Sequence, residues 1–291
     1  MASRQLAREL FGQHFQNPVL LASGTAGFGR ELEGVMDLDR LGGIVTKAVS
    51  LSPREGNLPP RVAEFRGGML NSIGLANPGL DRVREHELPW LVHRLQRAKV
   101  LVNVVGFTVG EYADVVSGLE GAPGVTAFEL NLSCPNTSAG GIEFGADATC
   151  VARIVSGCRS RTRLPLVAKL SPVLPDVGAM AVVARDAGAD GVSVVNTIPG
   201  ELFEAGGRPR LGNGFGGVSG PALLPIGVLA VARVAERTGG MPVIGVGGVR
   251  SAQDVRQYLS VGASLVAVGT AGLADPRLPQ RIVEDLEVGG D

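Results

Sequence analysis

Short apolar runs alternate along this chain with longer segments of mixed polarity. The runs are four to seven residues long and rich in Val, Ile, Leu and Ala, which is typical of buried strands. The eight predicted strands are Val19–Ser23, Gly43–Ala48, Val100–Gly106, Thr126–Leu132, Leu166–Leu170, Gly191–Asn196, Val243–Val246 and Leu265–Val268.

The intervening segments carry Ala, Leu and Arg in patterns that predict helices. They are Leu80–Gln96, Glu111–Gly118, Asp147–Arg159, Val177–Ala187, Pro221–Arg237, Ala252–Leu259 and Pro276–Leu286. Strands that alternate with helices predict parallel βαβ units. Eight such strands in 291 residues indicate an α/β fold of the closed (β/α)8 TIM-barrel type rather than an open sheet. We expect one domain over residues 1–291.

Local signals support these elements. The runs PVIGV and SLVAVGT are apolar on both faces, as barrel strands must be. Asp176 is placed to cap a helix from Val177, and Pro221 follows Gly220 where a first helical turn would begin.

Two strand-to-strand gaps, 48–100 and 196–243, are too long for a single helix and are rich in Gly and Pro. Both follow the carboxyl ends of strands, where barrel enzymes build their sites. We therefore expect long βα insertions at that face, forming a wall or lid.

Composition excludes several classes of protein. Hydrophobic residues make up 45% of the chain and the net charge is −1, which argues against nucleic acid as the main partner. No apolar run is long enough to span a membrane, and the first ten residues lack the apolar core of a signal peptide. The three cysteines are sparse, so we expect a cytoplasmic protein. The three histidines lie far from every motif, so we expect no metal site.

Polar or glycine residues follow every predicted strand at its carboxyl end. In a parallel barrel these ends share one mouth, so the clustering itself indicates a site. The residues are Ser23, Lys47, Asn103, Asn131, Lys169, Asn196, Thr197, Gly247, Gly248, Gly269 and Thr270, with Cys134 just beyond the fourth strand.

The glycine motifs GVGGVRS and AVGTAG follow strands seven and eight. Loops at these positions commonly bind phosphate through backbone N–H groups, although the same glycines could simply make tight turns. Since GVGG lacks the G-x-G-x-x-G pattern, a dinucleotide-binding Rossmann fold is not indicated.

Lys47 and Lys169 end apolar strands, where lysine is rarely buried without a partner. Each could pair with a carboxylate, stabilise negative charge on an anion or ring, or form a Schiff base as in aldolase-type lyase barrels. The amides of Asn71, Asn103 and Asn131, together with Asn196, favour a planar ligand that carries both C=O and N–H groups, although any one could cap a turn.

Cys134 lies among polar residues in FELNLSCPN, followed by Asn136. A desolvated thiol held by such neighbours can act as a base, whereas a packed cysteine is the alternative. Cys150 and Cys158 lie two turns apart on one predicted helix, and for them a structural role is favoured.

Nine motifs in order give the chain a resemblance to the dihydroorotate dehydrogenase family over essentially its whole length. They are NPVLLASGT, VTKAV, MLNSIGLANPG, ELNLSCPN, AKLSP, VVNT, GGVSGPA, GVGGV and AVGTA. The resemblance implies an FMN-bearing barrel that oxidises dihydroorotate to orotate in pyrimidine biosynthesis. It also implies that Cys134 is the base that removes the C5 proton while the C6 hydride passes to flavin N5. The membrane-linked class of the family uses Ser as this base, so the Cys here implies the soluble class, class 1.

The resemblance also implies ligand contacts, with Lys169 stabilising negative charge on the reduced flavin. Flavin contacts are expected from Ser23, Lys47, Ala48, Asn103, Asn131, Lys169, Val195, Gly220, Gly247, Gly248, Gly269 and Thr270. Substrate contacts are expected from Lys47, Asn71, Ser72, Ile73, Gly74, Leu75, Asn131, Asn196 and Thr197.

Two subtypes of class 1 differ in their electron acceptor. One is a homodimer that uses fumarate, and the other pairs with a subunit that carries FAD and a 2Fe–2S cluster and passes electrons to NAD. The stretches RVAEFRGGMLNSIGLANPG and SCPNTSAGGIEFG resemble the second subtype, known as type 1B. The chain has no Cys cluster, so any iron–sulfur centre belongs to a partner. We expect a homodimer or a heterotetramer with that partner.

Segment 199–215 departs from the family pattern, with Phe215 near the position where the family usually has a Lys.

Three other functions compete with the dehydrogenase hypothesis. They are a Schiff-base lyase, a flavin barrel that reduces uridine in tRNA, and a non-catalytic barrel subunit.

Overall fold

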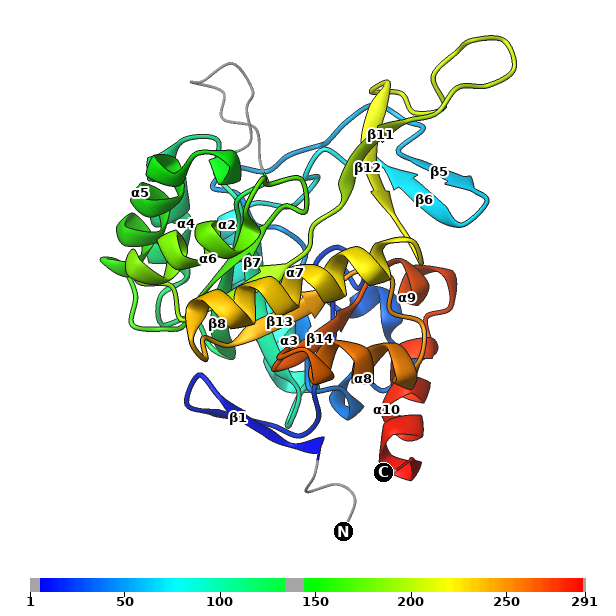
Figure 1. Cartoon of the computed structure of the whole chain (residues 1–291). Coiled ribbons are helices and arrows are strands. Elements are labelled where there is room, and N and C mark those ends of the chain that lie inside the picture. Colours follow the sequence, from blue (N-terminus) through cyan, green and yellow to red (C-terminus); the bar gives the residue numbers. More distant parts are fainter. Residues whose placement is uncertain (1–5, 134–143, 290–291) are drawn as a thin grey trace.

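The computed structural model of the chain describes residues 6–133 and 144–289 (Figure 1). Within them, eight parallel strands close into a barrel, confirming the predicted fold. Around the barrel they follow their order in the chain: β3 (Val19–Leu21), β4 (Gly43–Val45), β7 (Lys99–Val104), β8 (Val125–Asn131), β9 (Leu166–Leu170), β10 (Gly191–Val194), β13 (Val243–Val246) and β14 (Leu265–Val268).

Several strands end earlier than predicted, because their last residues leave the ladder and line the mouth. Thus β4 ends at Val45 rather than Ala48, and β10 ends at Val194 rather than Asn196. The chain still follows the barrel there, since the Thr46 N–H donates to the Leu101 carbonyl over 2.9 Å.

Helices cover the barrel, and each of the seven predicted segments contains a helix. They are α2 (Leu80–Arg82), η3 (Val83–Glu87), α3 (Leu88–Arg94), α4 (Val109–Leu119), α5 (Ala148–Arg159), α6 (Val177–Asp186), α7 (Leu223–Thr238), α8 (Ala252–Ser260) and α10 (Leu278–Val288), with short α9 (Thr270–Ala274), η1 (Arg30–Leu32), η2 (Leu38–Arg40) and η5 (Phe144–Ala146) besides. None of the helices in the described part of the chain combines the length and apolar character needed to cross a bilayer.

Local sequence explains two details of the helices. Pro89 has no N–H to donate to the preceding turn, and a π-helical stretch, η3, lies just before it between α2 and α3. The Asp176 carboxylate caps α6 as predicted, accepting from the Ala179 N–H over 2.9 Å. Pro221 was predicted to open α7, but it lies in the turn before the helix, which begins at Leu223.

Two small β structures lie at opposite ends of the barrel (Figure 1). At the amino end, β1 (Arg8–Leu10) and β2 (Gln13–Phe15) form a hairpin that inserts Phe15 into the barrel core. At the carboxyl end, β5 (Val62–Phe65), β6 (Gly68–Asn71), β11 (Ile198–Glu201) and β12 (Phe215–Ser219) form an antiparallel sheet in the order β11-β12-β6-β5. This sheet, the mouth sheet, is built from the two long insertions that the sequence placed there.

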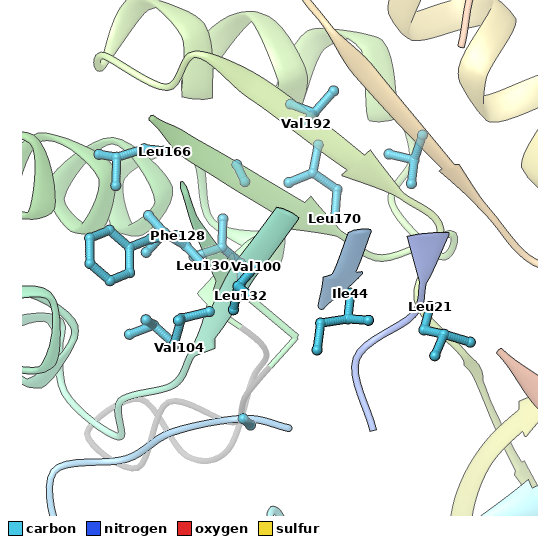
Figure 2. Close-up of a cluster of buried hydrophobic side chains, with 14 of the residues drawn as sticks. Leu21, Ile44, Val100, Val104, Phe128, Leu130, Leu132, Leu166, Leu170 and Val192 are labelled. Atoms are coloured by element: carbon cyan, nitrogen blue, oxygen red, sulfur yellow. The ribbon is translucent and has the colours of Figure 1, made fainter. Parts of the chain in front are cut away.

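Alternation along the strands divides the core into two layers. Outward-facing side chains pack against the helices, and Figure 2 shows Phe128, Leu166 and Val192 among them. Inward-facing side chains such as Leu101, Ala127 and Val167 fill the barrel. Because successive residues face opposite sides of a strand, Asn103, Glu129, Lys169 and Ser193 also point inward, one step nearer the carboxyl end.

Candidate active site

A buried polar layer lies inside the barrel beneath its carboxyl-end mouth. The Glu129 carboxylate accepts from Asn103 Nδ2 over 2.6 Å and lies 3.4 Å from Lys169 Nζ. Their side chains are almost fully buried, at 2% exposure for Glu129 and 8% for Lys169. Lys169 therefore takes the carboxylate-paired arrangement, one of the alternatives that the sequence left open.

Two buried oxygens of this layer have no hydrogen-bond partner among the described residues. They are Asn103 Oδ1 and Ser193 Oγ, and both side chains are fully buried. Ser193 lies opposite Lys169 in the parallel ladder of β9 and β10. Since buried polar groups in folded proteins are normally satisfied, these oxygens indicate that a polar ligand or water belongs above them.

Two of the predicted asparagines meet at the mouth. Asn196 Nδ2 donates to Asn131 Oδ1 over 3.4 Å, and Asn196 Oδ1 accepts from the Thr197 N–H over 2.8 Å. The Tyr112 hydroxyl fixes the end of β8 by donating to the Asn131 carbonyl over 2.7 Å. Asn131 is also the ladder neighbour of Lys169 on β9, so an amide pair and a cation share one side of the mouth.

The mouth sheet brings Asn71 towards this amide pair. Asn71 Nδ2 donates to the Gly217 carbonyl over 3.2 Å, and the two residues are ladder partners on β6 and β12. Gly217 in turn packs against Thr197, since an added Cβ would lie 2.1 Å from Thr197 Oγ1. Residues Ser72 to Leu75 follow β6 directly, so the predicted substrate segment adjoins the mouth.

Lys47 occupies a different environment from Lys169. Its backbone N–H donates to the Gly27 carbonyl over 2.8 Å, and the half-buried side chain has no hydrogen bond or ion pair among the described residues. Ser23 Oγ donates to the Thr46 carbonyl over 2.8 Å, which joins the ends of β3 and β4 beside it. Lys47 is thus a cation available to an anionic ligand.

The loops after β13 and β14 carry left-handed glycines and the start of a short helix. Gly247 and Gly248 have φ angles of +122° and +73°, a region that side-chain-bearing residues rarely adopt. Among the residues that the structure describes, no side chain caps α9, whose first N–H groups follow Gly269. Thr270 Oγ1 donates to Ser219 Oγ over 2.7 Å. The buried Tyr258 hydroxyl holds the loop after β13 by donating to the Gly247 carbonyl over 2.7 Å.

The remaining cysteines fit the structural role that the sequence favoured. Cys158 is fully buried, and burial raises the pKa of its thiol to about 12. Burial, and then the charge of Asp147, also raise the pKa of half-buried Cys150. Cys134 and Asn136 lie outside the described residues.

Sequence reasoning missed three residues of this site: Glu129, Tyr112 and Tyr258. Glu129 did carry a signal, since a carboxylate within the apolar strand FELNL needs a buried partner. The tyrosines carried none, because their hydroxyls act on carbonyls 19 and 11 positions away along the chain.

Comparison with known proteins decides the family. The model of the family described as dihydroorotate dehydrogenase matches residues 5–288. The chain belongs to this family.

Its relatives agree over nearly full length. It is 46% identical over 283 residues to a protein of Geobacillus kaustophilus, with 97% of this chain and 90% of the relative covered. It is 45% identical over 279 residues to one of Desulforudis audaxviator, with 95% and 89% covered. Both relatives are named dihydroorotate dehydrogenase B (NAD(+)), catalytic subunit. The predicted family and the predicted type 1B resemblance are therefore confirmed.

Proposed function

We propose that this chain is the catalytic subunit of an NAD-linked dihydroorotate dehydrogenase that oxidises dihydroorotate to orotate with FMN. The observation that carries the proposal is the mouth itself, where the Asn131–Asn196 amide pair lies beside Lys169 on neighbouring strands. Amides that donate and accept suit a planar ring with C=O and N–H groups, and Lys47, whose side chain has no partner among the described residues, is available to the acid group of such a ligand.

Three observations support FMN as the resident cofactor. The oxygens of Asn103 and Ser193 that have no partner in the described part of the chain lie beneath the mouth and suit the polar edge of a flavin ring. The left-handed glycines after β13 suit its phosphate, as does the start of α9, which no side chain of residues 6–133 or 144–289 caps. We assign the flavin contacts to the predicted set that runs from Ser23 and Lys47 to Gly269 and Thr270.

Each residue then has a role in the reaction. Lys47 binds an anionic group of the substrate, and Asn71, Asn131 and Asn196 orient the ring. Cys134 takes the C5 proton as a thiolate, and loss of that proton and of the C6 hydride leaves the C5=C6 double bond of orotate. FMN, when bound, supplies the hydride acceptor.

The electrons leave through a partner in this proposal. The name "catalytic subunit" of the relatives implies a second subunit, to which we assign FAD and a 2Fe–2S cluster, with NAD as the final acceptor. The Schiff-base lyase alternative is disfavoured at Lys169, because an ammonium held in an ion pair has no free electron pair for a carbonyl.

The test is anaerobic reduction of the purified chain by dihydroorotate, followed by fumarate or NAD offered separately. We expect the flavin absorbance to bleach and neither acceptor to restore it until the electron-transfer subunit and NAD are both present. Reoxidation by fumarate alone would refute the NAD-linked assignment. A colourless chain that takes up no FMN would refute the flavin proposal.

Cys134→Ala tests the base. The variant should bind FMN normally but should not be bleached by dihydroorotate at neutral pH, because the thiolate that accepts the proton is missing. Cys150→Ala, on α5, is the matched control and should bleach like the parent. Bleaching of Cys134→Ala at the parent rate would remove Cys134 from the mechanism.

A further inference from the structure

Glu129 is a buried carboxylate that the proposed reaction does not use. It lies inside the barrel on β8, with 2% of its side chain exposed. Its neighbours on the inward face of β8 are Ala127, which is fully buried in the barrel, and Asn131, which is half-buried at the mouth. A carboxylate in such a place is energetically costly unless it is paired and hydrogen-bonded.

The partners of Glu129 are well defined. Asn103 Nδ2 donates to Oε1 over 2.6 Å, and Lys169 Nζ lies 3.4 Å from the same oxygen. Glu129 contributes one negative charge and Lys169 one positive charge, so the polar layer as a whole is neutral. Without Glu129 the layer would hold a single cation in a medium that screens charge poorly.

We infer that Glu129 is a positioning residue for the flavin site: it holds the Lys169 ammonium and offsets its charge, so that the reduction potential of the bound flavin stays lower than Lys169 alone would set it. The inference rests on the proposed function, since it concerns FMN above this layer. Asn103 is the third member, and its amide orients the carboxylate from the neighbouring strand β7.

The physical reason is differential stabilisation of the two flavin states. A reduced flavin carries more negative charge than an oxidised one, so a nearby uncompensated cation stabilises the reduced state more. A carboxylate next to that cation cancels part of the effect. In a subunit that must hand its electrons onward to a partner, a lower potential favours that transfer.

Glu129→Gln is the direct test, because it keeps the size and the hydrogen-bonding oxygen but removes the charge. We expect the ratio of FMN dissociation constants, oxidised over reduced, to rise about tenfold, which corresponds to a potential about 30 mV higher for a two-electron couple. The potential is measured by anaerobic titration against a reference dye, and the two dissociation constants by flavin fluorescence and reconstitution.

Glu87→Gln is the matched control. Glu87 is also a buried carboxylate in ion pairs, with Arg30 and Arg82, but it lies on η3 in the outer helical layer. The Glu87→Gln variant should have a lower free energy of unfolding than the parent but the same flavin reduction potential. An equal change in both variants would mean that the effect is only loss of packing, and would overturn the inference.

A second pair keeps the inference testable if Glu129→Gln does not fold. Lys169→Gln and the double variant Glu129→Gln/Lys169→Gln differ only in the Glu129 charge, and the double variant leaves no unpaired buried charge. The double variant should again show the higher ratio, by about tenfold. The role of Glu129 alone is overturned if the flavin potential is the same in Glu129→Gln as in the parent and the same in the double variant as in Lys169→Gln. The proposed function is overturned if the parent chain binds no FMN.

Discussion

Gly248 offers a quantitative test of the proposal that the loop after β13 binds the FMN phosphate. Its φ of +73° disfavours any side chain, and an added Cβ would lie 2.4 Å from the Leu224 backbone nitrogen in the first turn of α7. The left-handed conformation costs an alanine about 1–2 kcal/mol, and forcing extra volume into packed backbone adds roughly 1–3 kcal/mol. We therefore expect Gly248→Ala to lower the free energy of unfolding by about 2–5 kcal/mol.

Gly34 separates the two contributions. It has nearly the same φ, +75°, but an added Cβ there meets nothing within 4 Å. Gly34→Ala should therefore lose only the conformational share, about 1–2 kcal/mol, and keep its FMN affinity.

Urea unfolding gives the stabilities, and flavin fluorescence gives the FMN dissociation constants. In Gly248→Ala the α7 backbone or the loop must shift, so FMN should bind at least tenfold more weakly than in Gly34→Ala. Equal FMN affinity in the two variants would refute the assignment of this loop to the phosphate.

Two further predictions concern charged groups on opposite sides of the molecule. Lys47→Met should raise the concentration of dihydroorotate needed for half-maximal bleaching by at least tenfold. The reason is that it removes a cation that has no carboxylate partner in the described part of the chain. An unchanged concentration in the bleaching titration would exclude Lys47 as the residue that binds the substrate anion. Burial alone would raise the pKa of Asp39, but backbone N–H groups of Ala98, Arg97 and Gln96 donate to its carboxylate and lower the pKa below 3.8. The stabilisation is complete at pH values above the pKa of Asp39 in the unfolded chain and is lost as the pH falls through its pKa in the folded chain. Asp39→Asn should therefore lower the free energy of unfolding by about 1 kcal/mol at neutral pH. In urea unfolding at a series of pH values, this difference from the parent should shrink at acid pH, and a difference that does not depend on pH would contradict the argument.

The barrel could be predicted from the sequence because each of its strands is a local apolar run. The residues of the mouth could also be predicted, because the carboxyl ends of parallel strands in a barrel meet at one face. Lys47, Asn131 and Lys169 lie at those ends. The parallel order then followed from the helices between the strands.

The mouth sheet and the hairpin were not readable. In β5 and β12 the polar and apolar positions alternate weakly, and β6 pairs with β12 across about 150 positions of the chain, so no local pattern could reveal the ladder. The Glu129–Lys169 pair was missed for a similar reason, because the two residues lie 40 positions apart and only barrel closure brings them together. The hairpin turn contains Phe11 at a φ of +57°, a left-handed conformation that the sequence does not predict for a phenylalanine.

A crystal structure of the chain grown with FMN and orotate tests the central claim most directly. We expect the flavin across the carboxyl end of the barrel, its phosphate at the backbone of Gly248 and Thr270, its ring above Asn103 and Lys169, and orotate beside Lys47 and Asn196. Flavin bound anywhere else, or orotate bound away from the mouth, would contradict the account.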